Sequence, residues 1–279
     1  MTIKEAVDLF EQHQKSNVKK NTLRSYSKFL DHFQTRFSEQ QVVSMSPDAI
    51  SLLLEECTDG LSRSTRHLRY AQIKAFFNYV IEATGLNIKS PCSAASLSKT
   101  FKMAQHRPRK ILDKETVDEI IFKSGSNRDR LILELQARCG LRIGEVLNLH
   151  AADISGRKLV IQEPKSGKDE EVAFMPEHIS VRLAEYVASQ NLSPGDRVFP
   201  VCYSTVWNLV TGLGMKLNVR ISPHDLRRHS ATYASRNGVP LEIISKVLLR
   251  HQDLKTTQVY LGKISDTEAI RWMDMLHGK

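Results

Sequence analysis

The 279-residue sequence has few cysteines and no long apolar run, and these absences exclude several classes of protein. The four cysteines contain no CxxC pair and are widely scattered, which argues against a disulfide framework and against a zinc site: Cys57, Cys92, Cys139 and Cys202. No stretch approaches roughly 18 consecutive apolar residues, so a transmembrane helix is excluded. The N-terminus lacks the apolar core of a signal peptide, and we expect a cytoplasmic protein.

Complete nucleotide and metal motifs are missing as well. Gly167-Lys168 is typical of a P-loop, but Gln162 stands where the first glycine belongs and Asp169 replaces the Ser or Thr. His224 and His229 are five residues apart, whereas two zinc ligands that share a helix face are four apart. We therefore expect neither a cofactor nor a metal ion.

Acidic residues are absent from Ala83 to Leu112, although the chain holds 31 Asp and Glu in all. The stretch carries six basic side chains: Lys89, Lys99, Lys102, Arg107, Arg109 and Lys110. Because prolines interrupt it, we predict a basic linker over residues 89–110, between domains at residues 1–88 and 111–279. A linker of one sign favours contact with a phosphate backbone, the alternative being a purely structural connection. The net charge of +9 points to a polyanionic partner without separating DNA from RNA or a membrane surface.

Apolar periodicity predicts four helices in the first domain. Ile3, Ala6, Val7 and Phe10 recur at helical spacing, and the segments 23–37, 46–57 and 62–83 continue the pattern. The fourth helix opens with three arginines on one side, which form either a solvated face or a row of phosphate contacts: Arg63, Arg66 and Arg69.

The second domain mixes helices with a short hairpin. A helix is expected near residues 128–139, followed by strands at 158–162 and 171–174 that are joined by a turn. Further helices are expected at 176–189, 206–217, 223–237, 241–248, 254–261 and 266–276. The predicted fold class is thus mainly α with a small antiparallel β-sheet in the second domain.

One short motif carries chemistry. In Pro223-His224-Asp225-Leu226-Arg227, the histidine and the arginine are three residues apart and therefore share a helix face. Arg binds a phosphate through two N–H groups, and His donates or accepts a proton beside it. Such a pair is common by chance, but Arg142 precedes it in Gly-Leu-Arg-Ile-Gly-Glu, and His251 and Tyr260 follow it.

Arg, Lys, His-x-x-Arg, His and Tyr in this order resemble the tyrosine recombinase family, which includes the integrases and Xer-type recombinases. The resemblance also rests on His-Asp-Leu-Arg-Arg-His-Ser-Ala-Thr and His-Gln-Asp-Leu-Lys-Thr-Thr-Gln-Val-Tyr. The first domain resembles the family's core-binding module through Thr22-Leu23-Arg24-Ser25-Tyr26 and the segment 74–79. It begins within the first 25 residues, which favours a simple Xer-like enzyme without an additional N-terminal arm-binding domain.

The resemblance implies a site-specific recombinase that cleaves and rejoins DNA through a 3′-phosphotyrosyl intermediate, without metal or ATP. Tyr260 would be the nucleophile, and His224 would take its proton. Arg142 and Arg227 would clamp the phosphate that is attacked. Lys165 would be the general acid, with Lys168 in the same turn as the alternative.

Two further positions follow from the same resemblance. His251 would hydrogen-bond the scissile phosphate, although Arg250 before it stands where the family usually has Gly. Glu145 would orient the arginine clamp from one helical turn beyond Arg142.

The expected partner is a specific site in double-stranded DNA, bound at the nucleoid by a homotetramer. The last helix would dock on a neighbouring protomer, the alternative being its own domain. The arginines of the fourth helix and five of the linker residues would contact DNA: Arg63, Arg66, Arg69, Lys99, Lys102, Arg107, Arg109 and Lys110. The alternatives are a monomeric type IB-like topoisomerase and a catalytically silent DNA-binding factor.

Overall fold

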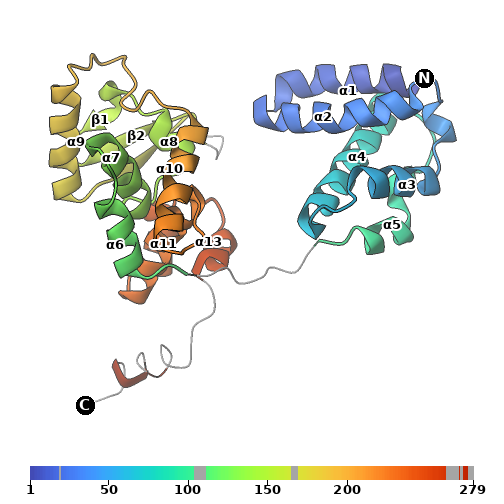
Figure 1. The fold of residues 1–279 in the computed structure, drawn as a ribbon. Helices are drawn as coiled ribbons and strands as arrows, with labels where there is room; N and C mark the ends of the chain where they lie inside the picture. The colour runs from blue at the N-terminus through green and yellow to red at the C-terminus, as the bar shows by residue number, and fades with distance from the viewer. Residues whose placement is uncertain (19, 104–110, 165–168, 262–269, 271–272, 276–279) are drawn as a thin grey trace. The chain divides into compact units, whose positions relative to one another are not determined.

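The computed structural model describes all residues except 19, 104–110, 165–168, 262–269, 271–272 and 276–279. The side chains of residues 259 and 260 are likewise outside the description. The chain divides into two compact units, Met1–Arg107 and Pro108–Lys279, each with its own apolar core (Figure 1). No helix in the described ranges is long and apolar enough to cross a membrane.

The first unit is helical throughout. Its main helices are α1 (Ile3–Asn17), α2 (Lys20–Phe37), α3 (Pro47–Cys57) and α4 (Arg63–Thr84), with a short turn η1 (Val42–Ser44). Ser46 caps α3 by accepting a hydrogen bond from the Ala49 N–H, as Ser-Pro predicts. The apolar positions that predicted α1 are all buried against α2 and α4. All four predicted helices are present.

The described part of the predicted linker differs from the expectation. Residues Pro91–Ser93 form η2 and Ala95–Thr100 form α5, and both pack onto the first unit. Three side chains of this segment are fully buried in the first unit's core: Cys92, Leu97 and Phe101. Phe101 stacks on Tyr70 with 5.9 Å between the ring centroids. The charge of the segment, on which the linker prediction rested, does not indicate this contact. The absence of acidic residues and the presence of prolines indicated a change of composition. The three apolar side chains, however, determine that the segment packs on the first unit.

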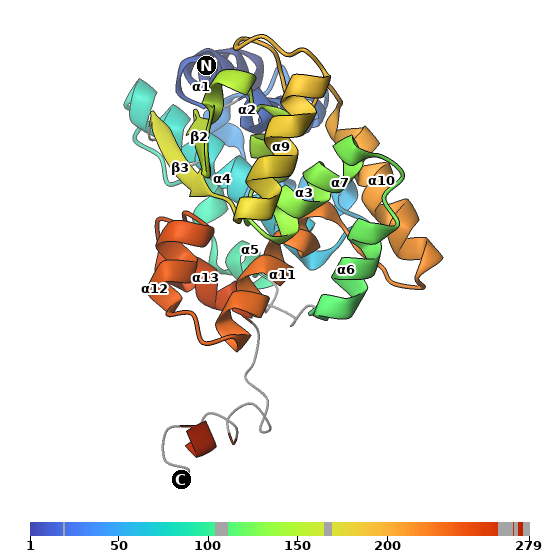
Figure 2. The ribbon, with the colours of Figure 1, turned by 90° about the vertical axis from the view of Figure 1, so that its left-hand side faces the viewer.

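The second unit is built around one helix whose last two turns are buried on every side. In α7 (Asn127–Ala137) the seven residues from Leu131 to Ala137 are all buried. Four helices pack on it: α6 (Lys114–Phe122), α8 (Ile143–Leu147), α9 (Glu177–Ser189) and α11 (Pro223–Arg236). The unit also contains α10 (Tyr203–Lys216), α12 (Leu241–Ile243), the π-helical turn η4 (Ile244–Leu248) and α13 (Leu254–Leu261). α11 packs directly on α7 and on α13, so these helices bring distant parts of the sequence together (Figure 2).

A three-stranded antiparallel sheet completes the second unit. After the turn η3 (Ala151–Asp153), β1 (Ile154–Ser155), β2 (Lys158–Gln162) and β3 (Glu170–Phe174) pair in chain order. β2 has the predicted bounds, β3 begins one residue early, and β1 was not predicted because two residues carry no periodicity. The predicted fold class is confirmed. Most of the expected last helix, 266–276, lies outside the described residues.

Candidate active site

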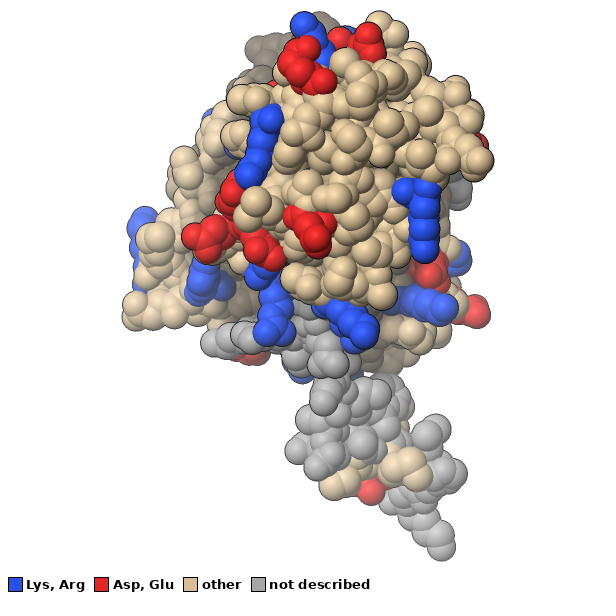
Figure 3. All heavy atoms as spheres, turned by 90° about the vertical axis from the view of Figure 1, so that its right-hand side faces the viewer, with Lys and Arg blue, Asp and Glu red and all other residues tan. Residues whose placement is uncertain are grey.

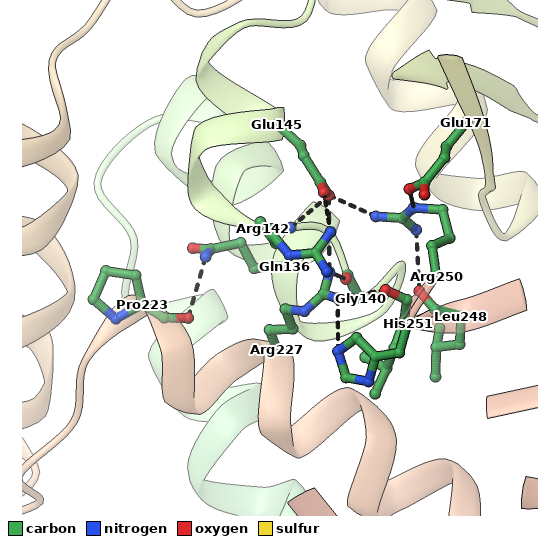
Figure 4. A network of polar contacts seen from close by, with 11 residues as sticks. Gln136, Gly140, Arg142, Glu145, Glu171, Pro223, Arg227, Leu248, Arg250 and His251 are labelled. Atoms are coloured by element: carbon green, nitrogen blue, oxygen red, sulfur yellow. Dashed lines mark hydrogen bonds and ion pairs between the residues drawn. The ribbon is translucent and has the colours of Figure 1, made fainter. Parts of the chain in front are cut away.

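The first site residue, Arg142, occupies the N-cap position of α8. Its Nη1 donates to Oε1 of Glu145 at 2.6 Å, and its backbone N–H donates to Oε2 at 2.8 Å. The helix therefore begins with a reciprocal arrangement in which the carboxylate of its first turn holds the arginine (Figure 4). Glu145 therefore contacts the arginine that the resemblance expects it to orient.

The second arginine, Arg227, lies on α11 and is only 1% exposed. Its Nη1 donates to the carbonyl of Gly140 and its Nη2 to the carbonyl of Leu249. Gly140 has φ +64°, and a Cβ there would stand 2.9 Å from the carbonyl oxygen of Leu248, so this turn requires glycine. Two carbonyls from separate loops thus hold the guanidinium plane of Arg227 in one orientation.

Glu145 is the common counter-ion of three guanidinium groups. Besides Arg142, its Oε2 lies 2.5 Å from Nη2 of Arg250 and 3.8 Å from Nη1 of Arg227 (Figure 4). Burial favours the protonated acid, but Arg250, Arg227 and Arg142 outweigh this effect and hold the pKa of Glu145 below its ordinary value. The carboxylate is therefore ionised at neutral pH, and the cluster carries an excess of positive charge.

His251 lies beside this cluster. Its Nε2 is 3.4 Å from Nη2 of Arg227, and its Nδ1 is 2.9 Å from Oγ1 of Thr257. Burial, followed by the charges of Arg227, Arg142, Arg250 and His224, lowers the pKa of His251 to about 4. Because a guanidinium N–H only donates, the neutral ring accepts at Nε2 and carries its proton at Nδ1.

These side chains face a single open cavity of about 490 Å³. Arg142, Arg227, His224, Arg250 and His251 line it, together with residues of α10, α11 and α13. His224 is exposed on the first turn of α11, where Asp225 binds the Ser222 N–H at 2.9 Å and fixes the start of the helix. The buried side chain of Gln136 on α7 donates to the Pro223 carbonyl at 3.1 Å, so the cavity floor is tied to the central helix.

Two predicted catalytic residues stand outside this description. Lys165 belongs to the segment 165–168 between β2 and β3, which is not described. Tyr260 lies on α13, one helical turn after Thr256, whose side chain lines the cavity, but the side chain of Tyr260 is not described.

His229, five residues beyond His224, is buried. Its Nδ1 lies 3.1 Å from the Leu112 carbonyl, and its ring stacks on Tyr233. In the described ranges, no group of three or more His, Cys, Asp or Glu is placed to hold a metal ion.

The three arginines of α4 have different environments. Arg63 is exposed, whereas Arg66 packs over the ring of Phe101 at 5.3 Å from the ring centroid. Arg69 donates to the carbonyl of Ser25 at 3.1 Å and to the side chain of Gln72 at 2.8 Å. Two of the three are therefore engaged in packing the first unit, which periodicity alone did not indicate.

Of the predicted basic contacts near the domain junction, Lys99 and Lys102 are exposed. Arg107, Arg109 and Lys110 lie outside the described residues. On the face shown in Figure 3, the Lys and Arg side chains are separated by other residues and do not merge into one basic patch.

The sequence prediction did not include two members of the cluster. Arg250 entered only as a departure from a glycine, yet it contacts Glu145 and also lies 3.5 Å from Glu171 of β3. Glu171 gave no signal, because an acid on a short strand is ordinarily solvated. The available signal in the sequence was Arg250 itself, which stands where the resembled family usually has Gly.

The arrangement suits a substrate with a singly charged phosphodiester. Arg142 and Arg227 come from different elements and converge on one cavity, and both donate hydrogen bonds without being able to accept one. Such donors stabilise charge that develops on phosphate oxygens more than they stabilise the ground state. The neutral His251 is a further hydrogen-bonding group at the same place.

Known protein families match most of this chain. The family model described as the phage integrase family matches residues 109–265, and that of the phage integrase N-terminal SAM-like domain matches residues 7–84. Tyrosine recombinase XerA of Pyrococcus horikoshii is 29% identical over 255 residues, which cover 86% of this chain and 82% of that relative.

Solved structures agree in fold. The Tn1549 transposon integrase in complex with transposon right end DNA has a TM-score of 0.78 at 16% identity, with 99% of both chains covered. A lambda integrase dimer bound to a COC′ core site has a TM-score of 0.76 at 16% identity, with 95% of this chain and 100% of that chain covered.

Proposed function

The chain belongs to the phage integrase family, and from this premise we propose that it is a site-specific recombinase that cleaves DNA with Tyr260 and rejoins it to another strand. The observation that carries the proposal is the convergence of Arg142, Arg227, His224 and His251 on one cavity that α13 also lines. Relatives named tyrosine recombinase and DNA-bound integrases of the same fold support the choice of DNA as partner.

Attack on a phosphodiester produces a five-coordinate phosphorus with additional negative charge on its non-bridging oxygens. Arg227 is held by two carbonyls and Arg142 by Glu145, so neither guanidinium has to reorganise when that charge appears. Donors of this kind each contribute roughly a hundredfold to a thousandfold in rate. They supply the electrostatic stabilisation that a metal ion provides in other nucleases.

The nucleophile requires activation. A free tyrosine has a pKa near 10, so at pH 7 about one in a thousand is ionised, which costs roughly 4 kcal/mol. The arginines that line the cavity favour the phenolate of a tyrosine that attacks a phosphate bound there, and His224 takes the phenolic proton. The oxygen of Tyr260 then forms a bond to phosphorus while the bond from phosphorus to the 5′-oxygen breaks.

The leaving 5′-oxygen takes a proton from Lys165, which follows β2 in the chain. One phosphodiester is replaced by another, the 3′-phosphotyrosine, so the bond energy is conserved and ATP is unnecessary. A 5′-hydroxyl of a partner strand reverses the step and releases Tyr260. Exchange between two duplexes requires four active subunits, and we propose a homotetramer on DNA in which the last helix of each protomer docks on a neighbour.

The test is trapping of the covalent intermediate. A target sequence is first selected from a random duplex library by binding to Tyr260→Phe protein. A nick is then placed near the cleavage position, so that the short 5′-hydroxyl fragment diffuses away and cannot reseal the strand. In EDTA, the wild-type protein is expected to accumulate a covalent adduct with DNA and Tyr260→Phe to form none.

Tyr203 provides the matched comparison because it is a tyrosine that lines the cavity. Tyr203→Phe is expected to form the adduct as the wild type does. Loss of the adduct in Tyr203→Phe but not in Tyr260→Phe would reassign the nucleophile. An absolute requirement for Mg²⁺ would refute the mechanism.

A further inference from the structure

One polar side chain of the central helix α7 lines the candidate site. Of the seven buried residues 131–137 on this helix, five are apolar, and Glu134 pairs with Arg130 and Arg182. The seventh, Gln136, is 1% exposed and lines the cavity. A buried amide costs stability unless its hydrogen-bonding groups are satisfied, so its presence in this apolar part of the helix requires a reason.

The amide of Gln136 is only half satisfied. Its Nε2 donates to the carbonyl of Pro223 at 3.1 Å, whereas its buried Oε1 has no hydrogen-bond partner among the described residues (Figure 4). An unsatisfied buried acceptor is destabilising, and an apolar side chain of the same size would avoid that cost. Stability alone therefore does not explain Gln136, and its hydrogen bond to Pro223 indicates another purpose.

This hydrogen bond acts on the peptide unit that carries His224. The carbonyl of Pro223 and the N–H of His224 belong to one planar group, so fixing the carbonyl fixes the plane from which the His224 side chain projects. Asp225 restrains the same turn from within α11, because it accepts from the Ser222 N–H at 2.9 Å and from the Ser222 hydroxyl at 2.6 Å. Gln136 adds a restraint from another helix, 87 residues away in the sequence.

The orientation of His224 depends on its backbone because its side chain is exposed. Close packing does not orient an exposed side chain, in contrast to Arg227 one turn later, which is 1% exposed and bound by two carbonyls. A hydrogen bond from the buried helix α7 to the first turn of α11 therefore gives His224 a rigid base.

We infer that Gln136 is a positioning residue, which holds the Pro223–His224 peptide and thereby directs the His224 imidazole into the cavity. The inference rests on the proposed function, in which His224 takes a proton from the nucleophile. It requires no contact between Gln136 and DNA, because Nε2 is engaged and Oε1 is buried.

Gln136→Met tests the inference because it preserves the volume of the side chain and removes the hydrogen bond. The half-satisfied buried amide is removed as well, so the Tm is expected to stay within about 3 °C of the wild type. NMR reports the position of His224: its ring protons, assigned by comparison with His224→Ala, should shift when inorganic phosphate is added, and should shift less in Gln136→Met. The ring signals of His251, which Thr257 and Arg227 hold, should respond alike in both proteins.

Adduct formation on the nicked duplex provides a second measurement. At about pH 7, a misplaced base should slow Gln136→Met by roughly 10- to 100-fold. The deficit should close as the pH approaches about 10, where tyrosine ionises without a base. The charged and titratable groups that line the cavity beside His224 are the same in both proteins and do not account for this difference: Arg142, Arg227, Arg250, His251 and Asp253.

Two further variants sharpen the comparison. His224→Ala should show the same pH dependence, and adding Gln136→Met to it should slow the reaction by less than about a further threefold. Thr232→Val is the matched control, because it removes a buried hydroxyl of α11 that donates to the carbonyls of Arg228 and His229, about two turns beyond His224. It should leave both the phosphate response of His224 and the pH dependence unchanged.

The inference would be overturned if the His224 ring did not respond to phosphate in the wild type, or responded equally in Gln136→Met. A deficit that is the same at about pH 7 and about pH 10, or additive effects of Gln136→Met and His224→Ala, would also overturn it. Failure of the wild-type protein to form any adduct would instead refute the proposed function, while the phosphate titration would still test how Gln136 places His224.

Discussion

Replacement of Glu145 by glutamine tests whether one carboxylate holds the arginine cluster together. The substitution preserves the shape of the side chain but removes the charge that faces Arg142, Arg227 and Arg250. The three guanidinium groups then lie close together without the carboxylate that they shared. Arg250 still has the carboxylate of Glu171 at 3.5 Å. The protein should lose stability because the remaining positive charges repel one another.

The expected loss follows from the burial of the pairs. Removing one partner of a buried ion pair costs about 3 to 5 kcal/mol, and the amide retains part of the hydrogen bonding, so about 3 kcal/mol is expected. In a unit of this size, 1 kcal/mol shifts the midpoint of thermal unfolding by roughly 2 to 4 °C. Glu145→Gln should therefore lower the Tm of the second unit by about 6 to 12 °C.

Scanning calorimetry with and without sulfate measures the effect. Arg142, Arg227 and Arg250 line the cavity in which the proposed function places a phosphate, so sulfate should raise the Tm of Glu145→Gln more than that of the wild type. Glu119→Gln is the control, because Glu119 forms an exposed pair with Lys123 worth less than about 1 kcal/mol. A Tm for Glu145→Gln within about 2 °C of wild type, or equal stabilisation of both proteins by sulfate, would refute this account of the cluster.

Two further outcomes follow from the same cavity. Arg227→Lys keeps the charge, but an ammonium group cannot bind the carbonyls of Gly140 and Leu249 as the planar guanidinium does. Adduct formation should therefore slow by roughly a hundredfold to a thousandfold in single-turnover assays. An unchanged rate would show that the positive charge alone is sufficient. The pKa of His251 is about 4 in the folded protein and 6.5 for the free side chain, so the unfolded chain takes up the proton first as pH falls. The free energy of unfolding should therefore fall as pH drops from about 6.5 to about 4, by up to roughly 1.4 kcal/mol per pH unit. Urea unfolding of wild type and His251→Gln across this range should show a shallower decline in the variant, and parallel curves would contradict the assignment.

Local signals in the sequence predicted much of the fold. The helices α1 to α4 followed from apolar spacing, and Ser46-Pro47 marked the start of α3 because capping depends on neighbouring residues. The bounds of β2 were likewise predicted from a short run of β-favouring residues that is followed by a turn. These features depend on interactions across one helical turn or one hairpin, which a single sequence displays directly.

The sequence also predicted a set of candidate site residues. Arg142, the His224–Arg227 pair, His251 and Tyr260 stand in an order that predicts the chemistry by family resemblance. Glu145 was predicted to orient Arg142, and its place one turn away in the same helix makes that contact local. Their roles in the reaction remain the proposal stated above.

Contacts between distant segments could be decided only by the tertiary structure. The burial of Leu97 and Phe101 assigns residues 91–101 to the first unit, although their charge indicated a linker. Arg69 is engaged at the Ser25 carbonyl, 44 residues away, and Arg250 reaches Glu145 across 105 residues. The sequence by itself determined which charged groups the protein has and in what order, whereas the tertiary structure decided which of them share a buried region, because burial and neighbouring charge depend on which distant segments fold against one another.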